Sequence, residues 1–216
     1  MRARNPRLAE GSGDVDSDLA ESLQALKASF QQRVLPAQFG KADTARVDAL
    51  RAKLRVPRRF REFLLAADPL DVETRTPAER VRLVPSERLL EEQHGFALTE
   101  TGEARSTAAP SGWRPGWVVV AHSALLGDPY FLDVGMPDAE GDCPVYTAMT
   151  GTETWKPRLC ASSFATFLRI LAIGMDVAKN FPDRDVDMDD EQVFREALGP
   201  RIREYDPAAA KAGHWT

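Results

Sequence analysis

Histidines are the side chains best suited to acid–base or metal chemistry near neutral pH, and the sequence has His94, His122 and His214. No two of them have the His-x-x-x-His spacing that places two metal ligands on one helix face. Neither Cys143 nor Cys160 belongs to a Cys-x-x-Cys pair. We therefore expect no metal site, no cofactor, and two cysteines that stay reduced.

One set of residues could support hydrolysis. His122 precedes Ser123, and Asp128 and Asp133 follow within eleven residues of His122, so a hydrolase using His122, Asp128 and Asp133 is a low-ranked hypothesis. Neighbours on a strand point in different directions, and no Gly-x-Ser-x-Gly elbow is present. The favoured interpretation is structural: His122 holds a loop, while Asp128 and Asp133 bond to nearby backbone. We expect no catalytic residues.

A phosphate-binding loop is also not indicated. Gly11-Ser12-Gly13 precedes acidic residues and lacks the following Lys-Ser/Thr pair, so the match carries no function. A basic stretch has two interpretations, a nucleic-acid patch or, as we favour, the solvated face of two helices. It consists of Arg51, Lys53, Arg55, Arg58, Arg59 and Arg61.

An acidic run near the end of the chain is the candidate partner-binding segment. It could be a docking surface for a basic protein or a solvated linker that leads into a helix, and both interpretations stay open. The run consists of Asp183, Asp185, Asp187, Asp189, Asp190 and Glu191.

Composition narrows the function further. The chain has 216 residues, a formal net charge of −5 and 43% hydrophobic residues, enough to build a core. Residues 1–63 carry 13 Lys and Arg against 8 Asp and Glu, and residues 64–216 carry 15 against 25. An acidic balance argues against general nucleic-acid binding. Without a signal peptide or an apolar run long enough to span a bilayer, we expect a cytoplasmic protein that contacts no membrane.

Helices are expected at both ends of the chain. Leu19, Leu23, Leu26 and Phe30 share one helix face, and further helices are expected over 44–54 and 57–68. Near the C-terminus, helices are expected around 163–171 and 191–198, with a tail that frays after Pro207.

The middle of the chain has the pattern of a sheet. Strands are expected over 81–84, 117–121, 130–134 and 145–148, with Ser86 capping a short helix and an exposed loop over 98–116. Short turns join the last three strands and predict an antiparallel meander. The predicted fold is α+β: a single antiparallel sheet flanked by N-terminal and C-terminal helices. We divide it into a flexible leader (1–16), an α+β domain with an N-terminal helical extension (17–175), and an acidic linker, helix and tail (176–216).

The order of motifs over residues 44–173 resembles the SUKH superfamily, which comprises fungal cell-wall-synthesis regulators and bacterial immunity proteins. Val56-Pro57 leads into a Phe-rich helix, Gly127-Asp128 precedes a Phe-Leu-Asp strand, and Ser163-Phe164 begins a closing helix. The matching positions, structural in that family, are Pro57, Phe60, Trp117, Gly127, Asp128, Phe131, Asp133, Tyr146, Trp155, Ser163, Phe164 and Phe167.

This resemblance implies binding without catalysis. The leading hypothesis is an immunity protein that neutralises a cognate bacterial toxin by direct binding, with a basic nuclease domain as the candidate toxin. The alternative is an intracellular scaffold or regulatory protein with the same fold. Neither hypothesis requires direct contact with nucleic acid.

Overall fold

The protein is a mixed helix-and-sheet fold built around one antiparallel sheet of seven strands, whose order in space follows their order in the chain. The computed structural model describes residues 17–105, 112–182 and 188–216. The predicted leader (1–16) and Asp183, Asp185 and Asp187 lie outside them. The strands are β1 (Ala37–Gly40), β2 (Asp68–Arg75), β3 (Arg80–Leu83), β4 (Trp117–Ser123), β5 (Pro129–Asp133), β6 (Val145–Thr147) and β7 (Arg158–Ala161). The predicted α+β class and antiparallel meander are confirmed.

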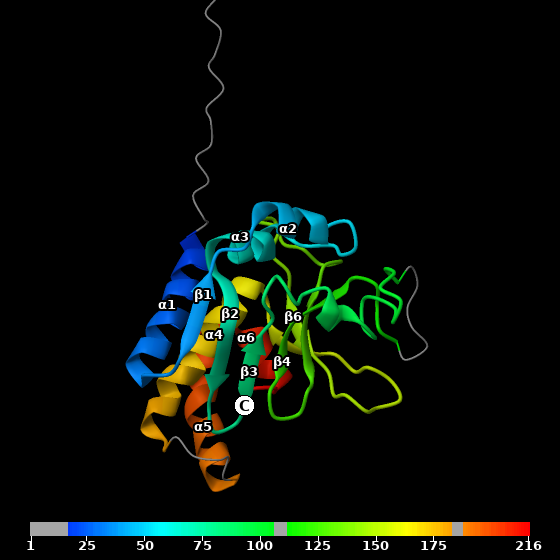
Figure 1. The fold of residues 1–216 in the computed structure, drawn as a ribbon. Helices are drawn as coiled ribbons and strands as arrows, with labels where there is room; N and C mark the ends of the chain where they lie inside the picture. Colours follow the sequence, from blue (N-terminus) through cyan, green and yellow to red (C-terminus); the bar gives the residue numbers. More distant parts are fainter. Residues whose placement is uncertain (1–16, 106–111, 183–187) are drawn as a thin grey trace, which may run out of the picture.

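The helices are α1 (Ser17–Arg33), α2 (Thr44–Leu50), α3 (Arg58–Ala67), α4 (Phe164–Val177), α5 (Met188–Tyr205) and α6 (Pro207–Ala212), with short 3-10 helices η1 (Glu91–Gln93) and η2 (Ala178–Asn180). Helices α1, α4 and α5 lie together on one side of the sheet, and α2 lies beyond one end of it (Figure 1). Helix α4 is central because it packs against α1, α5 and β7. In the part of the chain that the structure describes, no helix has the length and apolar character needed to cross a membrane.

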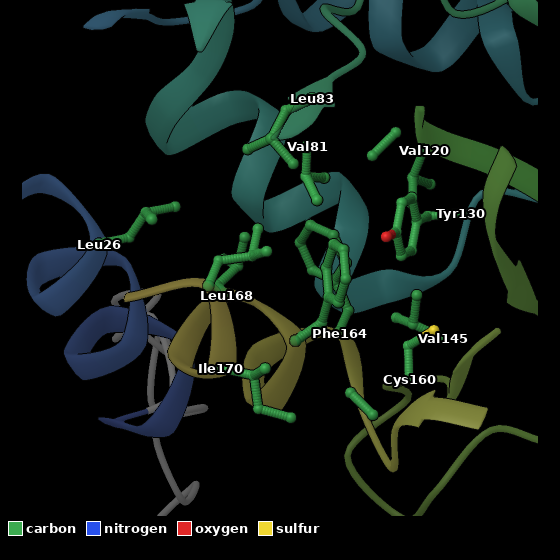
Figure 2. Packing of buried hydrophobic residues seen from close by; sticks show 14 of the residues in the cluster. Leu26, Val81, Leu83, Val120, Tyr130, Val145, Cys160, Phe164, Leu168 and Ile170 are labelled. Atoms are coloured by element: carbon green, nitrogen blue, oxygen red, sulfur yellow. The ribbon is translucent and has the colours of Figure 1, made fainter. Parts of the chain in front are cut away.

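The main core lies between the sheet and these helices. Tyr130 and Leu132 of β5 belong to it, together with Phe164 and Phe167 of α4. Figure 2 shows Val120, Tyr130 and Val145 from the sheet close to Phe164 from α4. The pattern Phe164, Phe167, Leu168, Leu171 places four buried side chains on α4, as the sequence predicts, because three- and four-residue steps return to the same helix face.

A second apolar cluster covers the opposite face of the sheet. Phe131 points away from Tyr130 and Leu132, as alternation along a strand requires, and packs with Trp113, Trp117, Val119 and Ala148. The Trp113 ring lies 4.7 Å from that of Phe131. Every residue of β5 is therefore buried. The sequence predicts an exposed loop over 98–116, but Trp113 in this segment is fully buried. That prediction is therefore wrong for Trp113.

Three strands were not predicted: β1, β2 and β7. Strand β2 begins directly where α3 ends and carries Asp68, Asp71 and Glu73, so it lacks the apolar run that identifies a strand. The prediction that Ser86 caps a helix is wrong. Its Oγ donates to Asp68 Oδ2 at 2.6 Å, its N–H donates to Oδ1 at 2.8 Å, and only η1 forms after it.

The prediction that the chain frays after Pro207 is also wrong. Asp206 caps α6 by accepting from the Ala209 N–H at 2.9 Å, and it also accepts from the Ser162 N–H and hydroxyl. Trp215 is buried, and its Nε1 donates to the Cys160 carbonyl at 2.8 Å. These bonds hold the last residues against β7 and the adjoining Ser162.

Backbone strain at the end of α1 gives a stability prediction. Val34 is 89% exposed and has φ of 54°, although it is β-branched. The left-handed conformation costs an L-residue about 1–2 kcal/mol, whereas glycine adopts it freely at helix ends. Because glycine also loses more backbone entropy, we expect Val34→Gly to raise the free energy of unfolding by about 1 kcal/mol.

Urea denaturation would measure this change. Val193 is the matched control because it is exposed within α5, and Val193→Gly should lower stability slightly. A loss of stability in Val34→Gly would show that Val34 is not strained.

Candidate functional site

The three residues of the hydrolase hypothesis do not meet. In the β4–β5 register, His122 lies opposite Pro129, whereas Asp133 lies opposite Trp117 at the other end of the strand pair. At about 3.3 Å per residue, Asp128 and Asp133 are roughly 16 Å apart along the strand. Asp133 accepts from Trp117 Nε1 at 3.1 Å and from the Gly135 N–H at 3.0 Å. These are structural contacts.

His122 and Ser123 contact different groups, as expected for neighbours on a strand. His122 Nε2 lies 3.0 Å from Glu92 Oε2, without the alignment of a hydrogen bond. The Ser123 hydroxyl instead donates to Glu79 Oε1 at 2.9 Å. No nucleophile–base pair forms between them.

Much of the basic stretch lies at the surface in ion pairs, as expected of a solvated helix face, but the expectation is wrong for Arg59, whose side chain is buried beside Glu62. Arg58 and Arg59 both contact Glu62, Arg61 contacts Asp48 at 2.9 Å, and Lys53 contacts Glu103. In the acidic run, Asp189, Asp190 and Glu191 form the first turn of α5. Within the described ranges, no group of three or more His, Cys, Asp or Glu side chains is arranged to hold a metal ion.

A large cleft lies at one end of the sheet. In an antiparallel meander, alternate turns lie at the same end, so the β2–β3 turn, the β4–β5 turn and the β6–β7 loop come together. We call this region the hairpin end (residues 76–79, 124–128 and 148–157). The cleft has a volume of about 850 Å³, and its lining includes residues of all three connections, with Glu191, Arg195 and His214 from the C-terminal segment.

Side-chain hydrogen bonds connect the loops of the hairpin end. Asp128 Oδ1 accepts from the Thr150 N–H at 2.7 Å and from its hydroxyl at 2.9 Å, which joins the second connection to the third. The Ser123–Glu79 hydrogen bond joins the β2–β3 turn to the β4–β5 turn. Ser123 Oγ also accepts from the Leu126 N–H at 3.0 Å. Asp128 therefore accepts a hydrogen bond from the backbone, as predicted, but the donor lies in another loop, the β6–β7 connection.

A buried polar network lies beneath the cleft. The Tyr130 hydroxyl donates to Glu79 Oε2 at 3.1 Å and lies 3.0 Å from His214 Nε2. Burial raises the pKa of Glu79 and lowers the pKa of His214 to about 3, with Arg195 and Arg158 adding to the decrease. The His214 imidazole is therefore neutral near pH 7 and fixes the chain end against the sheet.

Exposed apolar side chains lie along the cleft. Leu125 is 43% exposed, Leu126 is 70% exposed and Met149 is 67% exposed, and all three line the cleft. The Leu126 N–H donates to Ser123 Oγ. Met149 precedes Thr150, whose N–H donates to Asp128. Because ordered loops present these side chains to solvent, they form a candidate contact surface.

Sequence reasoning missed this surface, although one signal was available. Turns are normally rich in polar residues, but Ala124-Leu125-Leu126 precedes Gly127-Asp128 in the β4–β5 turn. Apolar side chains in such a turn have no core to enter and are candidates for contact with another molecule.

Loss of the Asp128 carboxylate should loosen the hairpin end. We expect Asp128→Ala to cost about 1–3 kcal/mol of stability, because two Thr150 donors lose their acceptor, and to speed exchange of the Thr150 amide hydrogen. Asp128→Asn keeps an oxygen acceptor and should have a smaller effect. Amide exchange followed by NMR measures both, and equal protection in the Ala variant and the wild type would refute the role of Asp128.

The depressed pKa of His214 predicts a pH-dependent stability. Between pH 6.5 and 3 the unfolded chain binds a proton at His214 that the folded chain excludes. Neutral His214 therefore contributes fully to the free energy of unfolding above pH 6.5, and this stabilisation is lost as the pH falls towards 3. His214→Gln removes the titration and keeps a donor near Tyr130. The stability of the wild type relative to the variant should fall by about 3 kcal/mol from pH 7 to pH 4.

Urea unfolding at pH 7, 5.5 and 4 would measure this difference. The raised pKa of Glu79 has the opposite pH dependence, but Glu79 is present in both proteins, so the comparison isolates His214 to a first approximation. Parallel stability curves for the two proteins would contradict the prediction.

Comparison with known proteins gives no assignment, since no family model matches the chain and no curated protein matches it.

Proposed function

We propose that this chain is a non-catalytic protein-binding domain that acts as an immunity protein, neutralising a cognate bacterial toxin by direct binding. The observation that carries the proposal is the exposure of Leu126 and Met149 on the ordered hairpin end. Both side chains line the same cleft, and apolar side chains gathered on one ordered surface are typical of protein contact sites.

The hairpin end has the properties of a preformed binding surface. The Asp128–Thr150 and Ser123–Glu79 bonds hold the loops before any partner arrives, so little conformational entropy is lost on association. Methionine is enriched at protein interfaces, and apolar side chains there gain most of their free energy by leaving water. Stoichiometric binding of a toxin needs such a surface and requires no reaction.

The sequence resemblance to the SUKH superfamily supports the choice of an immunity protein among binding functions. Its ordered motifs include Gly127-Asp128, which forms the β4–β5 turn of the hairpin end. The acidic first turn of α5, with Asp189, Asp190 and Glu191, borders the same cleft through Glu191. Its charge would favour encounter with a basic toxin domain. We place this action in the cytoplasm of the producing cell.

The decisive experiment co-expresses this chain with the product of the neighbouring gene. The neighbour should arrest growth when expressed alone and be harmless beside this chain. A scaffold or regulator with the same fold would have a stable endogenous partner without an adjacent toxin gene. A harmless neighbour, or arrest that persists in the presence of this chain, would refute the proposal.

A matched pair of variants locates the contact. Met149→Asp should weaken toxin binding at least ~30-fold, because loss of a central apolar contact costs about 2 kcal/mol. Met136 is a control of the same type: it is 58% exposed and lies in the β5–β6 connection at the other end of the sheet. Met136→Asp should bind normally by calorimetry. Equal affinities for the two variants would exclude the hairpin end as the interface.

A further inference from the structure

The charged side chains that line the cleft divide into those engaged within the protein and those that face solvent without such contacts. Glu191 pairs with Arg195 at 2.8 Å. Glu79 accepts from Ser123 and Tyr130, and Asp128 accepts from Thr150. The carboxylates closest to the sheet are therefore already bonded.

The wall formed by the β6–β7 loop has a different character. Lys156 and Arg158 are exposed and both line the cleft; Arg158 is the first residue of β7, and Lys156 lies two residues before it. Across residues 17–105, 112–182 and 188–216, neither forms an ion pair. Glu153 is the exposed acid of this loop, so two unpaired cations outweigh one anion on this wall.

We propose, on the basis of the protein-binding function above, that the cleft receives an acidic segment of the partner. An apolar side chain of that segment packs against Leu126 and Met149, and a neighbouring carboxylate pairs with Lys156 and Arg158. A cleft of about 850 Å³ is larger than one side chain requires, which favours a short stretch of polypeptide as its occupant.

This arrangement is compatible with a partner that is basic overall. The acidic first turn of α5 lies beside the cleft, with Glu191 in its lining, whereas Lys156 and Arg158 belong to the β6–β7 side. Partner cations next to α5 and a partner carboxylate next to β7 would give complementary charges on both sides. Such complementarity would set the orientation of the segment as well as its encounter rate.

Three capped peptides test the charge preference: acetyl-Gly-Glu-Leu-Leu-Glu-Gly-amide, the same peptide with Gln in place of Glu, and the same peptide with Lys in place of Glu. Each is titrated into the full ¹⁵N-labelled chain at low salt and followed by NMR. The Glu peptide should bind at least ~10-fold more tightly than the Gln peptide. Its shifts should be confined to residues 124–128 and 149–158, and the Lys peptide should bind most weakly.

Charge reversal provides the matched test. Lys156→Glu combined with Arg158→Glu should reverse the order of the Glu and Lys peptides. Arg203→Glu combined with Lys211→Glu makes the same change of net charge at exposed positions outside the cleft and should leave the order unchanged. Circular dichroism would verify that each variant is folded.

Several results would overturn the inference. These are no saturable shifts with the Glu peptide at millimolar concentration, equal or tighter binding of the Lys peptide, or an unchanged order in the cleft variant. Each can occur while Met149→Asp still weakens toxin binding, in which case the proposed function stands without the acidic segment. Peptide selectivity without any toxin neutralisation would refute the immunity function alone.

Discussion

The pairing of β4 with β5 is the constraint on which the rest of the structure depends. All five residues of β5 are buried, because the helices cover Tyr130 and Leu132 on one face and the aromatic cluster covers Phe131 on the other. A strand enclosed on both faces cannot shift its register without moving apolar side chains to the wrong side. The β4–β5 turn is therefore fixed in position, and the loops of the hairpin end are connected to it through Asp128 and Ser123.

The C-terminal segment reinforces this arrangement from the helical side. His214 reaches the Tyr130 hydroxyl, and Trp215 stacks on the Tyr130 ring with centroids 6.2 Å apart. The same tyrosine contacts Glu79 in the β2–β3 turn. One buried side chain thus connects the central strand, a neighbouring turn and the end of the chain. Buried polar networks of this kind specify a single arrangement when each member is hydrogen-bonded, which suits a surface that acts by shape.

The sequence predicted those elements that have a clear apolar pattern within their own residues. The apolar steps of α4 and the apolar runs of β4 and β5, separated by Gly127-Asp128-Pro129, were sufficient for those elements. Strand β2 escaped prediction because its charged residues form a strand only beside β1 and β3. The candidate site depends on still longer distances, since Glu79 and Tyr130 are 51 residues apart and Tyr130 and His214 are 84 apart. No periodicity in the sequence reports such contacts.

We propose that the ordered hairpin end, with the adjoining first turn of α5, is the surface that meets the protein partner. Hydrogen–deuterium exchange on the complex with the neighbouring gene's toxin tests it most directly. We expect slower exchange over residues 76–79, 124–128 and 149–158, and over the first turn of α5, when the toxin is bound, with little change elsewhere. Protection restricted to the opposite end of the sheet (134–144) or to the β1 edge, with the hairpin end unchanged, would contradict it.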